Sequence, residues 1–311
     1  MIVDMPDTTT SDVAKELVKL REEGGVVTLG RVLTLVISTH IGNEEEAIEA
    51  ANDASREHPM RIIVVSKPRP GDPSAKKHLG KVDGQIRVGG DAGASEVVVL
   101  RAFGHAALDE ESLVTGLLLP DAPVVAWWPG LAPEVPSKSP LGRIATRRIT
   151  DAATQADPLE ALKHAATAYR PGDTDFAWTR VTLWRTQLAA ILDQPPFEPV
   201  AAIEVSGSSD SPSTLLLAAW LGLKLQVPAS HHSSTEVTGI HGVTMSRPSG
   251  DISLRRDARD VATLEQPSQP THTLALPRRS LRDCLAEELR RLDPDEIYGE
   301  VITAGLRLLE G

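Results

Sequence analysis

Arg31-Val-Leu-Thr-Leu-Val-Ile-Ser38 and Arg61-Ile-Ile-Val-Val-Ser66 are two short, unbroken apolar runs that decide the fold of this chain. Their β-branched residues are typical of strands that are buried on both faces. Between the runs, Glu44–Glu57 is rich in alanine and acidic residues, which predicts a helix with a solvated face. Strand, helix and strand within about 35 residues form a βαβ unit, so we expect a parallel pair with a right-handed crossover.

The chain on either side of this unit continues the pattern up to a break at Arg170-Pro-Gly-Asp173. Upstream, residues 8–23 show apolar side chains at helical spacing behind a cap-like cluster. Downstream, the predicted strands are 85–88, 96–100, 122–129 and 143–149, and the predicted helices are 109–118 and 159–169. We therefore assign residues 1–169 to an N-terminal α/β domain.

A second βαβ unit is predicted after the break. Asp173–Leu192 has the strongest helical pattern, and the βαβ unit that follows consists of Val200–Ser206, Pro212–Leu221 and Leu223–Val227. Alternating residues between 236 and 276 predict hairpin strands, and a final long helix spans Ser280–Arg291. The predicted fold is α/β: two α/β domains, 1–169 and 170–311, each containing a βαβ unit with a mixed sheet, plus C-terminal helices.

The composition excludes several classes of function. The 311 residues carry a net charge of −11, which disfavours nucleic acid because affinity for a polyphosphate backbone needs clustered lysine and arginine. The single cysteine, Cys284, excludes an intrachain disulfide, and its place on an apolar helix face indicates packing. Without a signal peptide or about 20 consecutive apolar residues, we expect a cytoplasmic protein that does not cross a membrane.

The strongest candidate for a ligand site is the turn Ser206-Gly-Ser-Ser-Asp-Ser-Pro-Ser213, because backbone N–H groups at a helix N-terminus bind phosphate. It has one glycine and no lysine, so a well-capped helix is the favoured alternative. A metal would have to use His231, His232 and His241, but adjacent histidines on an extended chain point to opposite faces. We predict no catalytic, cofactor-binding or metal-binding residues.

The tryptophans are the most informative side chains. Trp127-Trp128-Pro129 ends a predicted strand and opens a proline-rich loop, so we expect at least one of the two indoles near the surface. Trp178, Arg180, Trp184 and Arg185 share one predicted helix, on which Trp184 belongs to the apolar stripe. Tryptophan and arginine are enriched at binding hot spots, so these segments are candidates for a protein interface as well as for the core.

Three stretches stand out together: Ala-Trp127-Trp128-Pro-Gly, Pro-Leu-Gly-Arg-Ile-Ala-Thr-Arg147-Arg148-Ile-Thr-Asp151, and Pro171-Gly-Asp-Thr-Asp-Phe-Ala-Trp178-Thr-Arg180-Val-Thr-Leu-Trp184-Arg185. With the tail Leu-Pro-Arg278-Arg279 and Asp-Cys284-Leu-Ala-Glu-Glu-Leu-Arg-Arg-Leu-Asp-Pro-Asp-Glu-Ile-Tyr298, they resemble the OpcA family of glucose-6-phosphate dehydrogenase assembly proteins. The resemblance runs from about residue 8 to residue 300, nearly the whole chain.

The resemblance implies a two-domain, non-catalytic assembly factor and allosteric activator without a cofactor. Its partner would be glucose-6-phosphate dehydrogenase, which oxidises glucose 6-phosphate with NADP at the entry to the oxidative pentose phosphate pathway. Cyanobacterial members are tied to thioredoxin through cysteine pairs, and a single cysteine departs from that pattern; the sequence looks more like the actinobacterial branch.

We expect the partner surface to include seven residues: Trp127, Trp128, Arg147, Arg148, Trp178, Arg180 and Arg185. One competing hypothesis is an enzyme or sensor that binds a sugar phosphate through the Ser206–Ser213 turn. Another is a purely structural scaffold that forms a complex without changing the rate of its partner.

Overall fold

A computed structural model of the chain describes residues 1–311 except 25–29, 74–79, 90–95, 236, 257–259 and 310–311. The chain divides into two compact units. The first contains Met1–Thr150 and Leu281–Asp293, and the second contains Asp151–Ser280 and Pro294–Gly311. The predicted fold class, α/β with two mixed sheets and C-terminal helices, is confirmed. The division into domains 1–169 and 170–311 stays a prediction.

The predicted βαβ unit lies in the middle of the first unit's sheet. β2 (Leu33–His40) and β3 (Met60–Lys67) are parallel, and α2 (Glu44–Ala54) connects them. Both strands are buried along almost their whole length. This burial on both faces explains why their sequences are continuous apolar runs and do not alternate with polar residues.

Further strands extend this sheet on both sides. β5 (Glu96–Ala102) pairs parallel with β3, and β6 (Val124–Trp127) and β7 (Arg147–Thr150) continue in parallel on the β2 side. β4 (Val82–Arg87) and β1 (Ile2–Met5) add to the β5 edge in antiparallel fashion. The strands of this sheet that belong to the first unit have the order β1-β4-β5-β3-β2-β6-β7. The direction of strand addition therefore reverses between β2 and β6.

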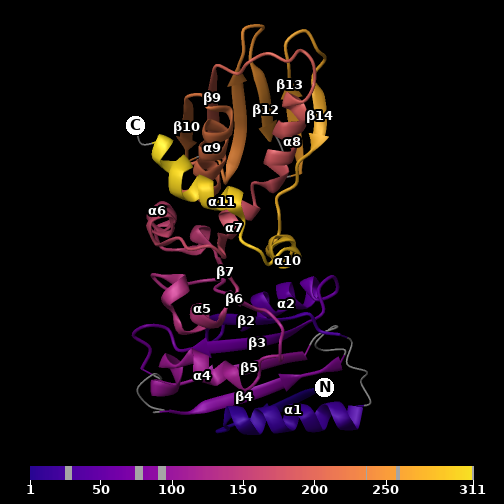
Figure 1. Cartoon of the computed structure of the whole chain (residues 1–311), viewed down its shortest axis with the longest axis vertical. Coiled ribbons are helices and arrows are strands. Elements are labelled where there is room, and N and C mark those ends of the chain that lie inside the picture. The colour runs from indigo at the N-terminus through magenta and orange to yellow at the C-terminus, as the bar shows by residue number, and fades with distance from the viewer. Residues whose placement is uncertain (25–29, 74–79, 90–95, 236, 257–259, 310–311) are drawn as a thin grey trace. The chain divides into compact units, whose positions relative to one another are not determined.

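Helices cover the sheet of the first unit. α1 (Thr10–Gly24) packs on β4 and buries its predicted apolar stripe (Figure 1). α4 (Glu110–Thr115) and α5 (Pro140–Ile144) are short, so the predicted helix 109–118 is present in part and the predicted strand 143–149 begins at Arg147. α10 (Leu281–Arg290) packs on α2 with Cys284 fully buried, which confirms the packing role predicted for this cysteine.

The second unit also has a mixed sheet, in the order β10-β9-β11-β12-β13-β14. β9 and β10 are parallel and the other pairings are antiparallel. The strands are β9 (Ala202–Ser208), β10 (Ala229–Ser234), β11 (Ile240–Ser246), β12 (Ile252–Arg256), β13 (Val261–Glu265) and β14 (His272–Ala275). Buried residues alternate with exposed ones along β9, β12 and β13, as expected for a sheet with one covered face.

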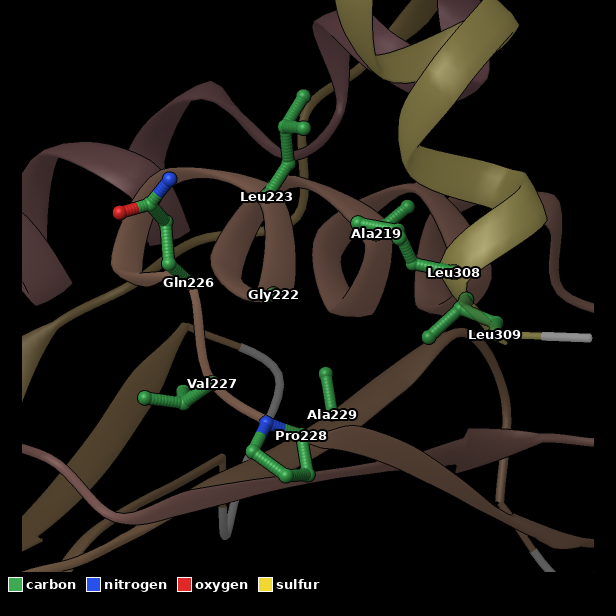
Figure 2. A pocket seen from close by; sticks show the side chains of 9 residues that line it. All are labelled: Ala219, Gly222, Leu223, Gln226, Val227, Pro228, Ala229, Leu308 and Leu309. Atoms are coloured by element: carbon green, nitrogen blue, oxygen red, sulfur yellow. The ribbon is translucent and has the colours of Figure 1, made fainter. Parts of the chain in front are cut away.

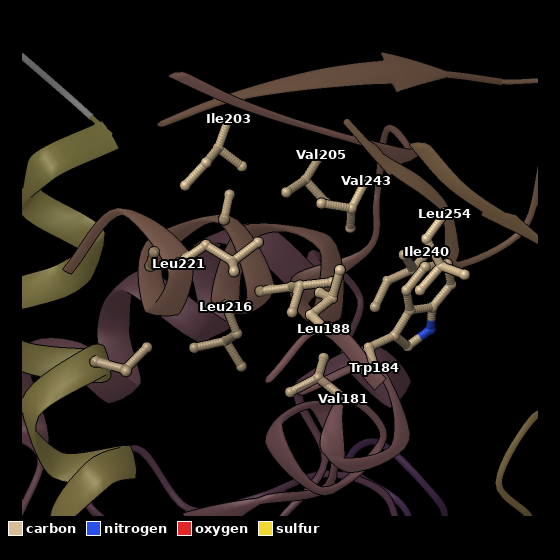
Figure 3. Packing of buried hydrophobic residues seen from close by; sticks show 14 of the residues in the cluster. Val181, Trp184, Leu188, Ile203, Val205, Leu216, Leu221, Ile240, Val243 and Leu254 are labelled. Atoms are coloured by element: carbon tan, nitrogen blue, oxygen red, sulfur yellow. The ribbon is translucent and has the colours of Figure 1, made fainter. Parts of the chain in front are cut away.

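Two helices cover that face of the second sheet. α8 (Thr182–Leu192) and α9 (Pro212–Leu225) place leucine and tryptophan side chains against valine and isoleucine of the strands (Figure 3). α6 (Pro158–Ala168), α11 (Glu296–Glu300), the π-helical turn Val301–Gly305 and the 3₁₀ turn Leu306–Leu309 complete the unit. No helix among the described residues combines the length and apolar character needed to cross a bilayer.

Two predictions about the second unit are wrong. The single helix predicted over Asp173–Leu192 is divided into a short strand β8 (Asp173–Asp175), α7 (Phe176–Thr179) and α8, because Asp175 is extended and caps α7. The third element predicted at Leu223–Val227 is the end of α9 followed by a left-handed residue, Gln226. The parallel partner of β9 is instead β10, whose polar, exposed side chains give no apolar pattern.

Candidate functional site

Trp127 and Trp128 lie inside the first unit, with 0% and 2% of their surface exposed. The expectation that at least one indole lies near the surface is therefore wrong. The reason is that β6 stands between β2 and β7, and the Trp128 N–H donates to the Ile149 carbonyl oxygen at 3.0 Å, which continues the pairing beyond Trp127. Proline at 129 ends the strand only after both indoles have entered the core.

Arg147 and Arg148 on β7 are also buried. The Arg147 guanidinium donates from Nε (3.1 Å) and Nη2 to Glu288 Oε2 on α10, and from Nη1 to the Asp293 carbonyl oxygen at 2.8 Å. Arg148 donates to the Ala145 carbonyl oxygen at 2.9 Å. Arg147 thus attaches the late helix α10 to the first unit.

Arg180 makes a two-pronged ion pair in the second unit. Its Nη1 and Nη2 donate to the two carboxylate oxygens of Asp151 at 2.7 and 2.6 Å. Asp151 is fully buried, and 29% of the Arg180 side chain is exposed. A second buried carboxylate, Asp175, accepts from the backbone N–H groups of Ala152 (2.9 Å) and Ala177 (2.8 Å). These bonds join the segment after β7 to α7.

Trp178 is the centre of an aromatic cluster. Its indole Nε1 donates to Asp295 Oδ2 at 2.8 Å, and its ring centroid lies 5.9 Å from that of Tyr298. The Arg185 guanidinium carbon lies 3.8 Å from the centroid of the same ring, within the range of a cation–π interaction. Tyr169 meets Tyr298 edge to face at 5.9 Å. Trp178 is 1% exposed, while Arg180 and Arg185 are half-buried.

The structure therefore brings Trp178, Arg180 and Arg185 together around α7 and the start of α8, whereas Trp127, Trp128, Arg147 and Arg148 belong to the core of the first unit. The sequence interpretation missed the carboxylates that bind these side chains, above all Asp175 and Glu288. Asp175 had a detectable signal, because aspartate ahead of a helix is typical of an N-cap. Glu288 had none, because its partner Arg147 stands 141 residues earlier.

Arg256 adds a second arginine–tryptophan contact, with its guanidinium carbon 5.0 Å from the Trp184 ring centroid. Its Nε donates to the Leu276 carbonyl oxygen at 3.0 Å. Burial, and then the nearby charge of Arg278, lower the pKa of Arg256 to about 10, and Asp260 opposes this shift. The group still carries its charge at neutral pH, so its bonds to carbonyl oxygens are charge-assisted.

Several polar groups of the Ser206–Ser213 turn are bonded within the chain. Ser211 caps α9 by accepting from the Thr214 N–H at 3.3 Å, and the Ser213 hydroxyl donates to the Ala177 carbonyl oxygen at 2.8 Å. Ser208 donates to the Asp210 carboxylate, which places a negative charge beside the helix N-terminus. This geometry fits the capped-helix interpretation better than a phosphate cradle.

The histidines of the metal hypothesis lie on two strands that are not adjacent in the sheet. His231 and His232 are on β10 and His241 is on β11, and β9 lies between the two. Across the described parts of the chain, no three His, Cys, Asp or Glu side chains gather as a metal site requires.

A recess of about 510 Å³ opens in the second unit where α9 ends and β10 begins (Figure 2). Its lining consists of Ala219, Gly222, Leu223, Gln226, Val227, Pro228, Ala229, Leu308 and Leu309. None of these side chains is charged or nucleophilic, so the recess offers shape and apolar surface but no catalytic group.

Known structures with a related outline are distant. The chain matches UDP-N-acetylglucosamine 3-dehydrogenase GnnA from Acidithiobacillus ferrooxidans at 9% identity and a TM-score of 0.33, over 89% of this chain and 97% of that one. It matches an oxidoreductase from Pseudomonas syringae at 10% identity and a TM-score of 0.38, over 85% of this chain and 87% of that one. It matches a glucose-6-phosphate dehydrogenase in complex with its substrate glucose-6-phosphate at 9% identity and a TM-score of 0.39, over 91% of each chain. Values this low carry no argument about function.

Comparison with curated proteins gives no significant match. Comparison with protein families gives two. Residues 51–167 match the glucose-6-phosphate dehydrogenase subunit N-terminal domain, and residues 171–302 match the C-terminal domain of the same subunit. The two matches follow one another in the order of the family and together span most of the chain, so the protein belongs to the OpcA family of glucose-6-phosphate dehydrogenase assembly proteins.

Proposed function

We propose that this chain is a non-catalytic subunit that binds glucose-6-phosphate dehydrogenase, favours its active oligomer and thereby activates it. The observation that supports the proposal is the ordered match to both domains of the dehydrogenase subunit family. The polar groups described above also serve the fold: the aspartates cap helices, and the arginines bind buried carboxylates or backbone carbonyl oxygens.

The activation follows from linkage. A protein that binds one state of its partner more tightly than another shifts the equilibrium by the difference in binding free energy. Preference for the active oligomer raises the fraction of dehydrogenase in that form without any chemistry by the subunit. Coupling of this kind is typically about 1–3 kcal/mol, which corresponds to a 5- to 150-fold effect.

The test is the steady-state rate of the cognate dehydrogenase with and without the subunit, combined with sizing of the mixture. Co-elution together with a higher kcat or a lower KM supports assembly and activation. Co-elution with unchanged kinetics indicates a structural scaffold, and separate elution with unchanged kinetics rejects the proposal.

The partner surface is proposed to include Arg180 and Arg185, whose side chains are half-buried. The buried tryptophans and Arg147 would contribute indirectly, each by fixing the backbone of its own unit. Arg180 is a poor first choice for substitution because alanine there leaves the buried Asp151 carboxylate without its partner. Arg185 is the better choice, since arginine is enriched at binding hot spots and its guanidinium stacks on the Trp178 ring.

Arg185→Ala is expected to weaken the complex by about 30-fold, the effect of losing a hot spot of about 2 kcal/mol. The measurement is titration of labelled dehydrogenase. Lys163→Ala is the matched control, because it also removes one positive charge from the second unit but at an exposed position on α6. Equal affinity of both variants and the wild type would exclude Arg185 from the interface.

The sugar-phosphate hypothesis makes a different prediction for the isolated subunit. A ligand that binds only the folded state raises the melting temperature in proportion to RT ln(1 + [L]/Kd). Because Ser208, Ser211 and Ser213 of the turn are bonded internally and Asp210 adds a negative charge, we expect glucose 6-phosphate to leave the melting temperature unchanged. A rise that grows with ligand concentration, and is lost on substituting Ser211, would favour the competing hypothesis.

A further inference from the structure

The reversal of strand order between β2 and β6 marks a particular place in the first unit. In open parallel α/β sheets, ligands bind beside such a reversal, at the carboxyl ends of the strands. A phosphate group is then held by N–H groups at the N-terminus of the helix that follows the first strand. Here that helix is α2, and the loop between β2 and α2 is Ile41-Gly42-Asn43.

Glu44, the first residue of α2, fills this position with its own carboxylate and is only 4% exposed. Its Oε2 accepts from the Gly42 backbone N–H at 2.6 Å, and its Oε1 accepts from the Ser66 hydroxyl at 2.8 Å and from Arg101 Nε at 3.2 Å. Asn43, the N-cap residue, makes no side-chain capping bond to the helix. A backbone amide, a buried hydroxyl and a guanidinium are a donor set that suits phosphate.

A second buried acid and two basic side chains lie at the same end of the sheet as Glu44. Glu110 is the second buried acid at this end of the sheet; it accepts from the Ser38 hydroxyl at 2.6 Å and from Lys67 Nζ at 3.0 Å. Two carboxylates, Glu44 and Glu110, thus face two cations, Lys67 and Arg101. Removing the Glu44 carboxylate takes one negative charge away from Arg101 and leaves three donors, the Gly42 N–H, the Ser66 hydroxyl and Arg101 Nε, without this acceptor.

We propose that Glu44 is a built-in substitute for the phosphate of a bound ligand. The Glu44 carboxylate occupies the place at the N-terminus of α2 where a phosphate would bind, so the wild-type chain binds no nucleotide phosphate there. Removing the carboxylate turns the same donors into a binding site for inorganic phosphate. The inference does not rest on binding to the dehydrogenase, and its test uses the subunit alone.

The test is thermal unfolding of full-length Glu44→Ala in about 50 mM sodium phosphate and in sodium chloride of the same ionic strength. In chloride, the variant is expected to melt roughly 5 °C or more below the wild type, because Ser66, Arg101 and the Gly42 N–H lose their acceptor. Phosphate is expected to recover about 2–4 °C of this loss, while the wild type melts equally in both salts.

Two further variants serve as controls: one removes the charge of Glu44 but keeps its side-chain volume, and the other removes an exposed charge from the same helix. Glu44→Gln keeps the side-chain volume in place, so it is expected to lose stability without recovery by phosphate. Glu46→Ala removes an exposed charge from the same helix turn and is expected to match the wild type. Phosphate stabilisation of the wild type, equal recovery of the Ala and Gln variants, or no recovery of Glu44→Ala would each overturn the proposal.

Discussion

Glu288→Ala is expected to lower the free energy of unfolding by about 3–5 kcal/mol, the usual cost of leaving a buried charge without its partner. Side chains of Arg147 and Glu288 are only 4% and 5% exposed, so water cannot replace the lost carboxylate. The two bonds from the guanidinium to Glu288 disappear, and the bond to the Asp293 carbonyl oxygen remains. Urea unfolding followed by circular dichroism measures the loss.

Arg290→Ala provides the control on the same helix. Its partner is Glu57 at 3.5 Å, and the two side chains are 64% and 53% exposed, so the expected change is below about 1 kcal/mol. Replacing both buried partners, as Arg147→Met with Glu288→Leu, is expected to recover most of the stability because neither charge is then stranded. If Glu288→Ala costs no more than Arg290→Ala, α10 is not held by the buried pair.

Trp178→Ala is expected to cost about 3–5 kcal/mol of stability, since the indole is 1% exposed and its removal leaves a cavity beside Tyr298. Trp178→Phe keeps an aromatic ring but removes the 2.8 Å bond to Asp295, so a loss of about 1–2 kcal/mol is expected. Chemical denaturation of both variants tests the order.

The phenylalanine variant also decides the role of Trp178 in binding. If the indole acts by holding α7 and α11 together, folded Trp178→Phe should bind the dehydrogenase with nearly wild-type affinity. A tenfold loss of affinity in a variant with intact secondary structure would instead indicate that the partner contacts the indole directly. Lys163→Ala again serves as the control for an exposed position in the same unit.

The parts of the fold that follow from local pattern were predictable. The runs at 31–38 and 61–66 predict a parallel pair because only strands covered on both faces carry such continuous apolar sequence. β10 was not predictable in this way, since most side chains of the edge strand Ala229–Ser234 are exposed and create no apolar pattern. Its pairing with β9 depends on backbone hydrogen bonds, which every residue except proline can donate.

In the candidate site, too, some features followed from the local sequence and others did not. Clusters of tryptophan and arginine were recognisable along the chain, but their burial depended on partners remote in sequence. Trp128 is buried because β7 pairs beyond the end of β6, and Trp178 because Asp295 and Tyr298 return to it from the C-terminal segment. Hydrophobic periodicity does not report contacts of this kind, so the sequence indicated the residues and the structure was needed to show which way they face.

The return of α10 to the first unit has a consequence for the order of synthesis. Thr150 leaves the ribosome long before Leu281–Asp293 is made, and at about 5–20 residues per second the interval is on the order of 10 s. During that time Arg147 lacks Glu288, and the surface of α2 that α10 covers is open to solvent or to a chaperone. The half of the protein that is translated first is therefore finished last, and prematurely terminated chains never complete it.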